Sequence, residues 1–171
     1  MNQVSYSPAG IKTIISDAAG DDFILSSGGF AATVITQEGV EHFGIAGVDA
    51  GDTVIIASKK MCSLLGPRLS AAILAHEEAH CLLGHVEVAQ KAGPGMYDSM
   101  QFELEADAYA VSKTSANDVY EGLTAAMKAV TLLYLEATGI RSMDKQALRS
   151  MRRKMYKALE RRLVALAAAT L

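Results

Sequence analysis

Residues 71–83 read AAILAHEEAHCLL, and this stretch decides the fold. It contains the pattern His-Glu-x-x-His, in which His76, Glu77 and His80 are the fixed positions. Successive residues of an α-helix are rotated by about 100°, so His80 lies about 40° and Glu77 about 100° from His76. The two imidazoles can therefore hold one metal ion from the same helix face, with Glu77 beside it. Glu78 lies at about 200° on this helix, and we expect it to be a solvated surface carboxylate.

A second acidic pattern follows on a predicted helix that carries the sequence FELEADAYAV. Glu103 and Asp107 are four residues apart and share a helix face, whereas Glu105 points away from them. Glu103 can supply a third protein ligand, and Asp107 can hydrogen-bond the free ring nitrogen of a ligating histidine. Three protein ligands leave the fourth position of a zinc ion for water, which is typical of a catalytic site. We therefore expect one zinc ion per chain, with Glu77 as the general base.

The two motifs together resemble those of a known family. HEEAH at 76–80 followed by ELEAD at 103–107 is similar to the gluzincin metallopeptidases, which pair HExxH with a glutamate on the following helix. The ExxAD form is most similar to the HtpX-like and CAAX prenyl proteases and to their soluble minimal relatives, the minigluzincins. The resemblance covers residues 44–111, including a run of strand, short helix and active-site helix before HEEAH.

This resemblance implies a zincin-like fold and the same site roles. It implies that His76, His80 and Glu103 are metal ligands, that Glu77 is the base and that Asp107 supports a ligand. The chain differs from the membrane members of the family because it has no apolar stretch of membrane-spanning length. It also resembles ImmA-type peptidases, in which the residue after ExxA is commonly Asn.

Peptide hydrolysis also needs a donor to the developing oxyanion. Tyr97, in the connecting loop, and Tyr109, near the acidic pattern, are candidates, although the favoured interpretation of each is a half-buried core tyrosine. His85 would lie about 180° from His76 on a continued helix, so we expect it to face away from the metal. By analogy with the family, residues 44–47 could form the edge strand that pairs with substrate.

The order of predicted elements indicates an α+β domain, with a small sheet first and helices after it. The chain length fits one domain, residues 1–171. We predict a short helix over 8–19 and strands over 31–36, 40–46 and 53–58, with a hairpin turn at 37–39. Four helices are predicted after the sheet: from 66–67 to before Gly93, from 98–99, from 115–117 to Gly139, and over about 144–171.

Composition indicates a soluble, cytoplasmic protein. The first ten residues lack the basic start and apolar run of a signal peptide. The chain has two cysteines, Cys62 and Cys81, which are too few for a disulfide framework and are interpreted as reduced core thiols.

The charge is distributed unevenly along the chain. Residues 1–140 contain 7 basic and 17 acidic side chains, whereas residues 141–171 contain 9 basic and 2 acidic ones. The basic segment places Leu148, Met151, Met155, Leu159 and Leu163 at helical spacing, and its charged residues, Arg162 among them, are assigned to the remaining surface. Three interpretations remain: a helix docked on the acidic body, a surface for nucleic acid or an acidic membrane, and a segment that covers the zinc cleft.

The sequence thus predicts a zinc-dependent metalloendopeptidase that hydrolyses a polypeptide substrate. The alternative is a non-proteolytic zinc-binding regulatory protein, or a nucleic-acid-associated protein that uses its basic C-terminal helix on an acidic partner.

Overall fold

The strands come first along the chain and the helices follow, which is the segregation typical of an α+β fold. The computed structural model describes residues 2–20, 32–36, 45, 53–93, 99–138 and 145–168. The elements in these residues are β1 (Gln3–Tyr6), β2 (Lys12–Ser16), β3 (Ala32–Thr36), β4 (Thr53–Ser58), α3 (Lys59–Leu82), α4 (His85–Ala92), α5 (Ser99–Lys113), α6 (Ala116–Thr138) and α7 (Lys145–Ala168). The α+β prediction is confirmed.

The sheet has the strand order β1-β2-β4-β3, in which β2 and β4 are parallel and the outer pairs antiparallel. The helix predicted over residues 8–19 is wrong, because β2 occupies residues 12–16. The β-branched run Thr13-Ile14-Ile15 favours a strand, and it pairs with β4 in the register Ile14↔Ile56. Both of these isoleucines are fully buried, so tertiary packing fixes the strand.

Helix α3 carries the HExxH pattern and begins earlier than predicted. The Ser58 side chain caps it by accepting a hydrogen bond from the Met61 backbone N–H. The predicted start at 66–67 is instead a kink, where Gly66 has φ 74° and Pro67 opens the following helical segment. The helix ends at Leu82, and Gly84, with φ 70°, turns the chain into α4.

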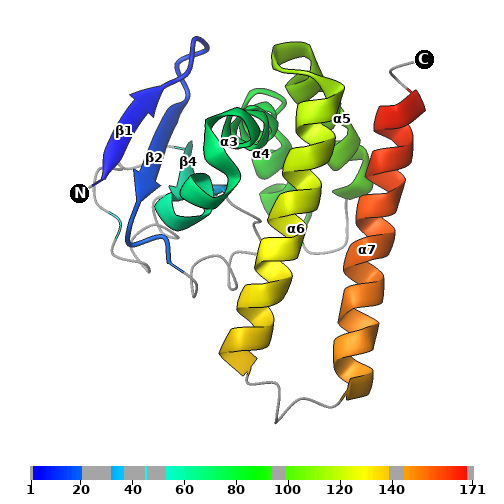
Figure 1. Cartoon of the computed structure of the whole chain (residues 1–171). Helices are drawn as coiled ribbons and strands as arrows, with labels where there is room; N and C mark the ends of the chain where they lie inside the picture. Colours follow the sequence, from blue (N-terminus) through cyan, green and yellow to red (C-terminus); the bar gives the residue numbers. More distant parts are fainter. Residues whose placement is uncertain are drawn as a thin grey trace.

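Helix α3 lies between the sheet and the other helices (Figure 1). It contacts β3 and β4 on one side and α5 and α6 on the other. Arg68 of α3 forms ion pairs with Asp118 and Glu121 of α6. The HExxH residues are thus held on a helix that is packed on both sides.

The basic helix α7 is docked against the body. Figure 1 shows α6 and α7 side by side, and α7 contacts both α5 and α6. Leu159 and Leu166 are buried and belong to the hydrophobic core. Arg162, which the sequence assigns to the solvated surface, lies on the same face and is only 4% exposed. This supports docking among the three interpretations of the basic segment.

Several predictions fall outside the described residues: the strand over 40–46 apart from Ile45, the turn at 37–39, the substrate strand at 44–47, and the positions of Tyr97, Asp98 and Gly139. Cys62 and Cys81 are both free thiols, as predicted. None of the helices in the described part of the chain has the length and apolarity that a membrane span requires.

Docking of α7 predicts that its buried leucines contribute to stability. We expect Leu159→Ala to lower the free energy of unfolding by about 2–5 kcal/mol, because Leu159 is 4% exposed and its truncation leaves a cavity. Val164→Ala is the control on the same helix, since Val164 is 65% exposed, and should change stability by less than about 0.5 kcal/mol. Urea unfolding of both variants measures the difference, and equal stabilities would contradict the docked arrangement.

Candidate metal site

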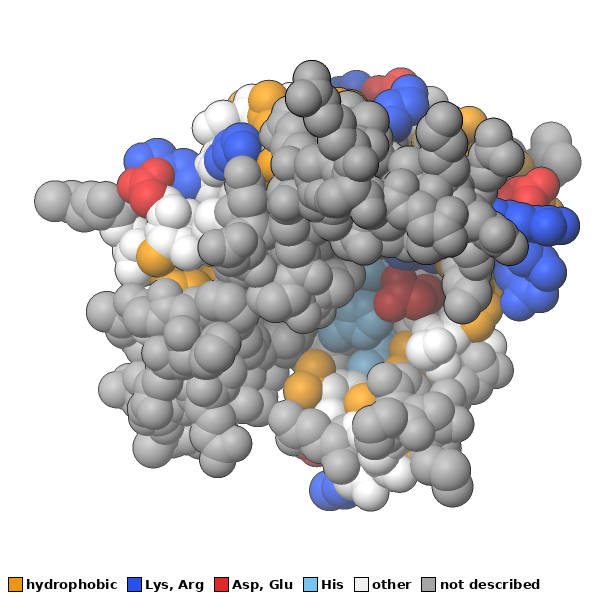
Figure 2. Space-filling model, turned by 90° about the horizontal axis from the view of Figure 1, so that it is seen from below, with side chains coloured by type: hydrophobic (Ala, Val, Ile, Leu, Met, Phe, Trp, Pro, Cys, Tyr) orange, Lys and Arg blue, Asp and Glu red, His pale blue; other side chains and the backbone are white. Residues whose placement is uncertain are grey.

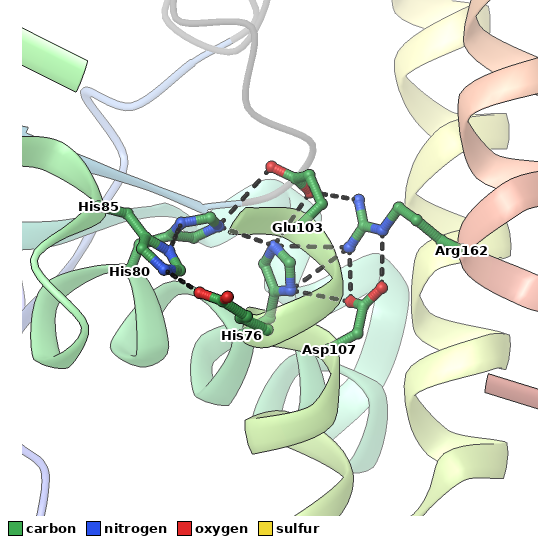
Figure 3. Close-up of polar contacts among 7 residues, drawn as sticks. His76, His80, His85, Glu103, Asp107 and Arg162 are labelled. Atoms are coloured by element: carbon green, nitrogen blue, oxygen red, sulfur yellow. Dashed lines mark hydrogen bonds and ion pairs between the residues drawn. The ribbon is translucent and has the colours of Figure 1, made fainter. Parts of the chain in front are cut away.

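Two helices bring three metal-ligating side chains together. His76 and His80 lie one turn apart on α3, and Glu103 reaches them from α5 (Figure 3). The Nε2 atoms of the two histidines are 3.1 Å apart. Glu103 places Oε2 3.4 Å from His76 Nε2 and Oε1 3.7 Å from His80 Nε2. The structure therefore assembles the three ligands that the sequence predicts.

These separations fit a metal with short bonds to nitrogen and oxygen. Two ligand atoms bonded at about 2.0–2.1 Å to a tetrahedral zinc ion are about 3.3 Å apart. The three observed separations lie within about half an ångström of that value. The group could therefore hold a metal ion without rearrangement of the two helices.

Asp107 lies behind His76, as the sequence predicts. Its Oδ1 atom is 3.0 Å from His76 Nδ1, and the residue is only 2% exposed. A proton on Nδ1 then points to the carboxylate, and the lone pair of Nε2 is left for a metal. Burial would raise the pKa of Asp107, but hydrogen bonds from Arg162 and His76 outweigh it and lower that pKa.

Arg162 of α7 also belongs to this cluster, although its sequence context predicts a surface position. Its Nε and Nη2 atoms donate to the two oxygens of Asp107 at 2.8 and 2.7 Å, and Nη1 lies 2.6 Å from Glu103 Oε2 (Figure 3). One signal could have identified it. Arg162 follows Leu159 by three positions and precedes Leu166 by four, so it lies on the apolar stripe rather than the polar face.

The cluster gathers three acidic side chains around one guanidinium. Glu77, Glu103 and Asp107 are three carboxylates, and Arg162 is the only guanidinium in contact with two of them among the described residues. Burial lowers the pKa of His76, but hydrogen bonds to Asp107 and Glu103 raise it to about 9. Burial would raise the pKa of Glu103, but the His76 hydrogen bond and the Arg162 charge lower it to about 2. The donor set of two imidazoles and one carboxylate fits a metal ion, whose binding would displace a proton from His76.

Glu77 is partly buried beside the ligands. Burial raises its pKa to about 7, and the neighbouring charge of Glu103 acts in the same direction. A carboxyl group with a pKa near neutrality can both accept and return a proton. Its neighbour His80 has a pKa lowered to about 4 by burial and by the charge on His76.

A continued helix would place His85 facing away from His76, but in the structure His85 lies against His80. The turn at Gly84 interrupts the helix and brings His85 Nδ1 to 3.0 Å from His80 Nδ1. On its other side, His85 Nε2 is 3.0 Å from Glu105 Oε2. His85 is not part of the His76, His80 and Glu103 group.

Two further predictions around α3 need correction. Glu78 is not a solvated carboxylate, because it is only 8% exposed. The hydroxyl of Tyr109 donates to its Oε2 atom at 3.0 Å. Tyr109 lies about 200° around α5 from Asp107, so its side chain points away from the ligand group. Its hydroxyl bonds to Glu78 instead.

The ligand group borders an open recess. Figure 2 shows histidine and acidic side chains inside a hollow on one face of the molecule. A pocket of about 160 Å³ lies beside His80 and Glu103, and its other lining residues are His85, Val86, Ala89, Ser99 and Phe102. The lining is mostly apolar, with metal-ligating groups on one wall.

Comparisons of this chain with protein-family models, with curated proteins and with solved structures found no match. Conclusions about function therefore rest on the geometry and chemistry of the site.

The buried ion pairs of Arg162 generate a stability prediction. We expect Arg162→Met to lower the free energy of unfolding by about 3–5 kcal/mol, because Asp107 is left buried without its cation. Arg161→Met removes the same charge from the exposed neighbouring position and should cost less than about 0.5 kcal/mol. Chemical denaturation of the two variants at pH 7 tests this, and a similar loss in both would mean that Arg162 acts only through net charge.

Proposed function

We propose that this chain is a zinc-dependent peptidase of the gluzincin type, with His76, His80 and Glu103 as zinc ligands and Glu77 as general base. The observation that carries this proposal is the convergence of two Nε2 atoms and one carboxylate: the Nε2 atoms of His76 and His80 are 3.1 Å apart, and they lie 3.4 and 3.7 Å from the two carboxylate oxygens of Glu103. The HExxH and ExxAD resemblance points to the same chemistry.

The donor set favours zinc over other biological metals. Two imidazole nitrogens and one carboxylate are ligands that zinc accepts in a four-coordinate site, whereas calcium and magnesium require mostly oxygen ligands. A structural zinc site has four protein ligands, and three with a water are typical of catalysis. Zinc bound here would act as a Lewis acid, polarising a peptide carbonyl and lowering the pKa of a water molecule.

The residues of the chain have separate tasks in this reaction. Glu77 accepts a proton from the attacking water and returns it to the leaving amine, which a carboxyl group with a pKa near 7 can do. Asp107 holds the Nδ1 proton of His76 and so keeps the ring oriented. Arg162 compensates the charges of Asp107 and Glu103 and holds both carboxylates in place.

The proposed substrate is a polypeptide. The mostly apolar pocket beside His80 and Glu103 offers a place for a substrate side chain next to the ligands. Tyr109 is not an oxyanion donor in this proposal, because its hydroxyl donates to Glu78.

Metal content tests the ligand set. The purified protein should contain about one zinc per chain, and Glu103→Ala should lose most of it because two histidines alone bind zinc poorly. Glu87→Ala is the control, since Glu87 is exposed on α4. The measurement is metal analysis after dialysis against a weak chelator. Full occupancy in Glu103→Ala would remove Glu103 from the ligands.

Glu77→Gln tests the role of the base. The amide keeps the shape of the side chain but cannot accept a proton, so zinc content and fold should be retained while cleavage of an unstructured protein such as casein is abolished. Glu87→Gln is the control, because Glu87 is exposed on α4.

The proposed mechanism is wrong if Glu77→Gln cleaves as well as the unsubstituted protein. If the protein binds zinc and cleaves nothing in a broad peptide library, the non-proteolytic regulatory function is favoured instead.

A further inference from the structure

We propose that His85 and Glu105 form a positioning relay behind His80, which keeps the proton of His80 on Nδ1 and leaves Nε2 free to bind the metal. The inference rests on the metal-binding part of the proposed function and is independent of peptide hydrolysis. It assigns a role to two residues that the sequence places away from the site.

The relay is a continuous chain of polar contacts. His80 Nδ1 is 3.0 Å from His85 Nδ1, and His85 Nε2 is 3.0 Å from Glu105 Oε2. The amide of Gln101 donates to the other oxygen of Glu105 at 2.7 Å. Figure 3 shows His85 and His80 adjacent, with His80 between His85 and the other two members of the group, His76 and Glu103. The chain therefore leads from a carboxylate on α5 to a metal ligand on α3.

The chemistry of the partners determines where each proton lies. An ionised carboxylate only accepts hydrogen bonds, so His85 Nε2 must carry a proton that it donates to Glu105. In the proposed relay His85 carries only this proton, so its Nδ1 atom accepts and His80 Nδ1 is the donor of the 3.0 Å contact. It follows that His80 Nε2 keeps its lone pair. This is the atom that lies 3.1 Å from His76 Nε2 and faces Glu103.

Local structure holds His85 in the required orientation. The residue is 4% exposed, and its ring stacks on Phe102 with a centroid distance of 4.2 Å and an interplanar angle of 3°. The positive φ of Gly84 makes the turn that returns His85 to the side of His80. Phe102 and Glu105 are three residues apart on α5, so one face of that helix supplies both the stacking and the hydrogen bond.

The relay gives His80 the same support that His76 has. His76 reaches a carboxylate directly, through the 3.0 Å contact of its Nδ1 with Asp107. His80 reaches a carboxylate through His85. Partners of this kind typically change metal affinity by about 10- to 100-fold when they are removed. We therefore expect His85 to contribute to metal affinity although it does not touch the metal.

The first test is spectroscopic and needs no metal. In the zinc-free, ¹⁵N-labelled full chain, two-bond ¹H–¹⁵N correlations of the imidazoles report which nitrogen of each ring is protonated. We expect His80 to be protonated on Nδ1 and His85 on Nε2, with a ¹⁵N–¹⁵N coupling across the hydrogen bond between their Nδ1 atoms. A proton on His85 Nδ1, or no coupling between the two rings, would overturn the relay.

The second test compares two substitutions of His85. Gln offers an oxygen to accept from His80 and an NH₂ to donate to Glu105, whereas Phe keeps the ring and the stack on Phe102 but has no acceptor. Chelator competition should show zinc affinity about 10- to 100-fold weaker in His85→Phe, and largely recovered in His85→Gln. Melting temperatures measured alongside separate loss of fold from loss of positioning.

The results distinguish the relay from the proposed peptidase. Unchanged zinc affinity in a folded His85→Phe variant would show that His85 is only a packed core histidine. Absence of peptide cleavage by the unsubstituted protein would instead count against the peptidase, while the ring protonation and zinc affinities would still decide the relay.

Discussion

The ion pairs of Arg162 with Asp107 and Glu103 are the interaction on which the rest of the site depends. Asp107 is 2% exposed, and a buried carboxylate is unfavourable unless a cation and hydrogen bonds compensate it. Arg162 provides both, and in doing so it joins α7 to α5. Asp107 in turn orients His76 on α3. A single guanidinium thus connects the docking of a helix with the orientation of a ligand two helices away.

Helix α5 combines two kinds of group in five residues. Glu103 faces the Nε2 atoms of His76 and His80, whereas Asp107 contacts Nδ1 of His76 directly and Glu105 reaches Nδ1 of His80 through His85 of α4. Because these positions are two residues apart, they point to different sides of the helix. The packing of α5 against α3 therefore fixes the ligand set and its hydrogen bonds at the same time.

The sequence predicts those parts of the site that depend on spacing within one helix. The position of Glu103 beside the histidines and that of Asp107 behind His76 follow from their four-residue separation on one helix face. It does not predict Arg162, because the contact joins residues far apart in the chain and a basic segment is normally solvated. The sequence predicts the wrong direction for His85 because it assumes that the helix of His76 continues. That helix ends before Gly84, whose positive φ turns the chain. The sequence predicts a helix over 8–19 instead of the strand at 12–16, because the pairing of that strand with β4 joins residues far apart in the chain.

The sequence separations in the site have a consequence for folding. His76 and His80 can meet in an isolated helix, but Arg162 lies 55 residues from Asp107 and 86 from His76. Closing such long loops is entropically costly and is compensated only when the surrounding helices have packed. An early folding intermediate would therefore offer a metal two imidazoles without their supporting charges. Tight metal binding would thus be a property of the completed tertiary structure, and the rate of metal capture would report the last stage of folding.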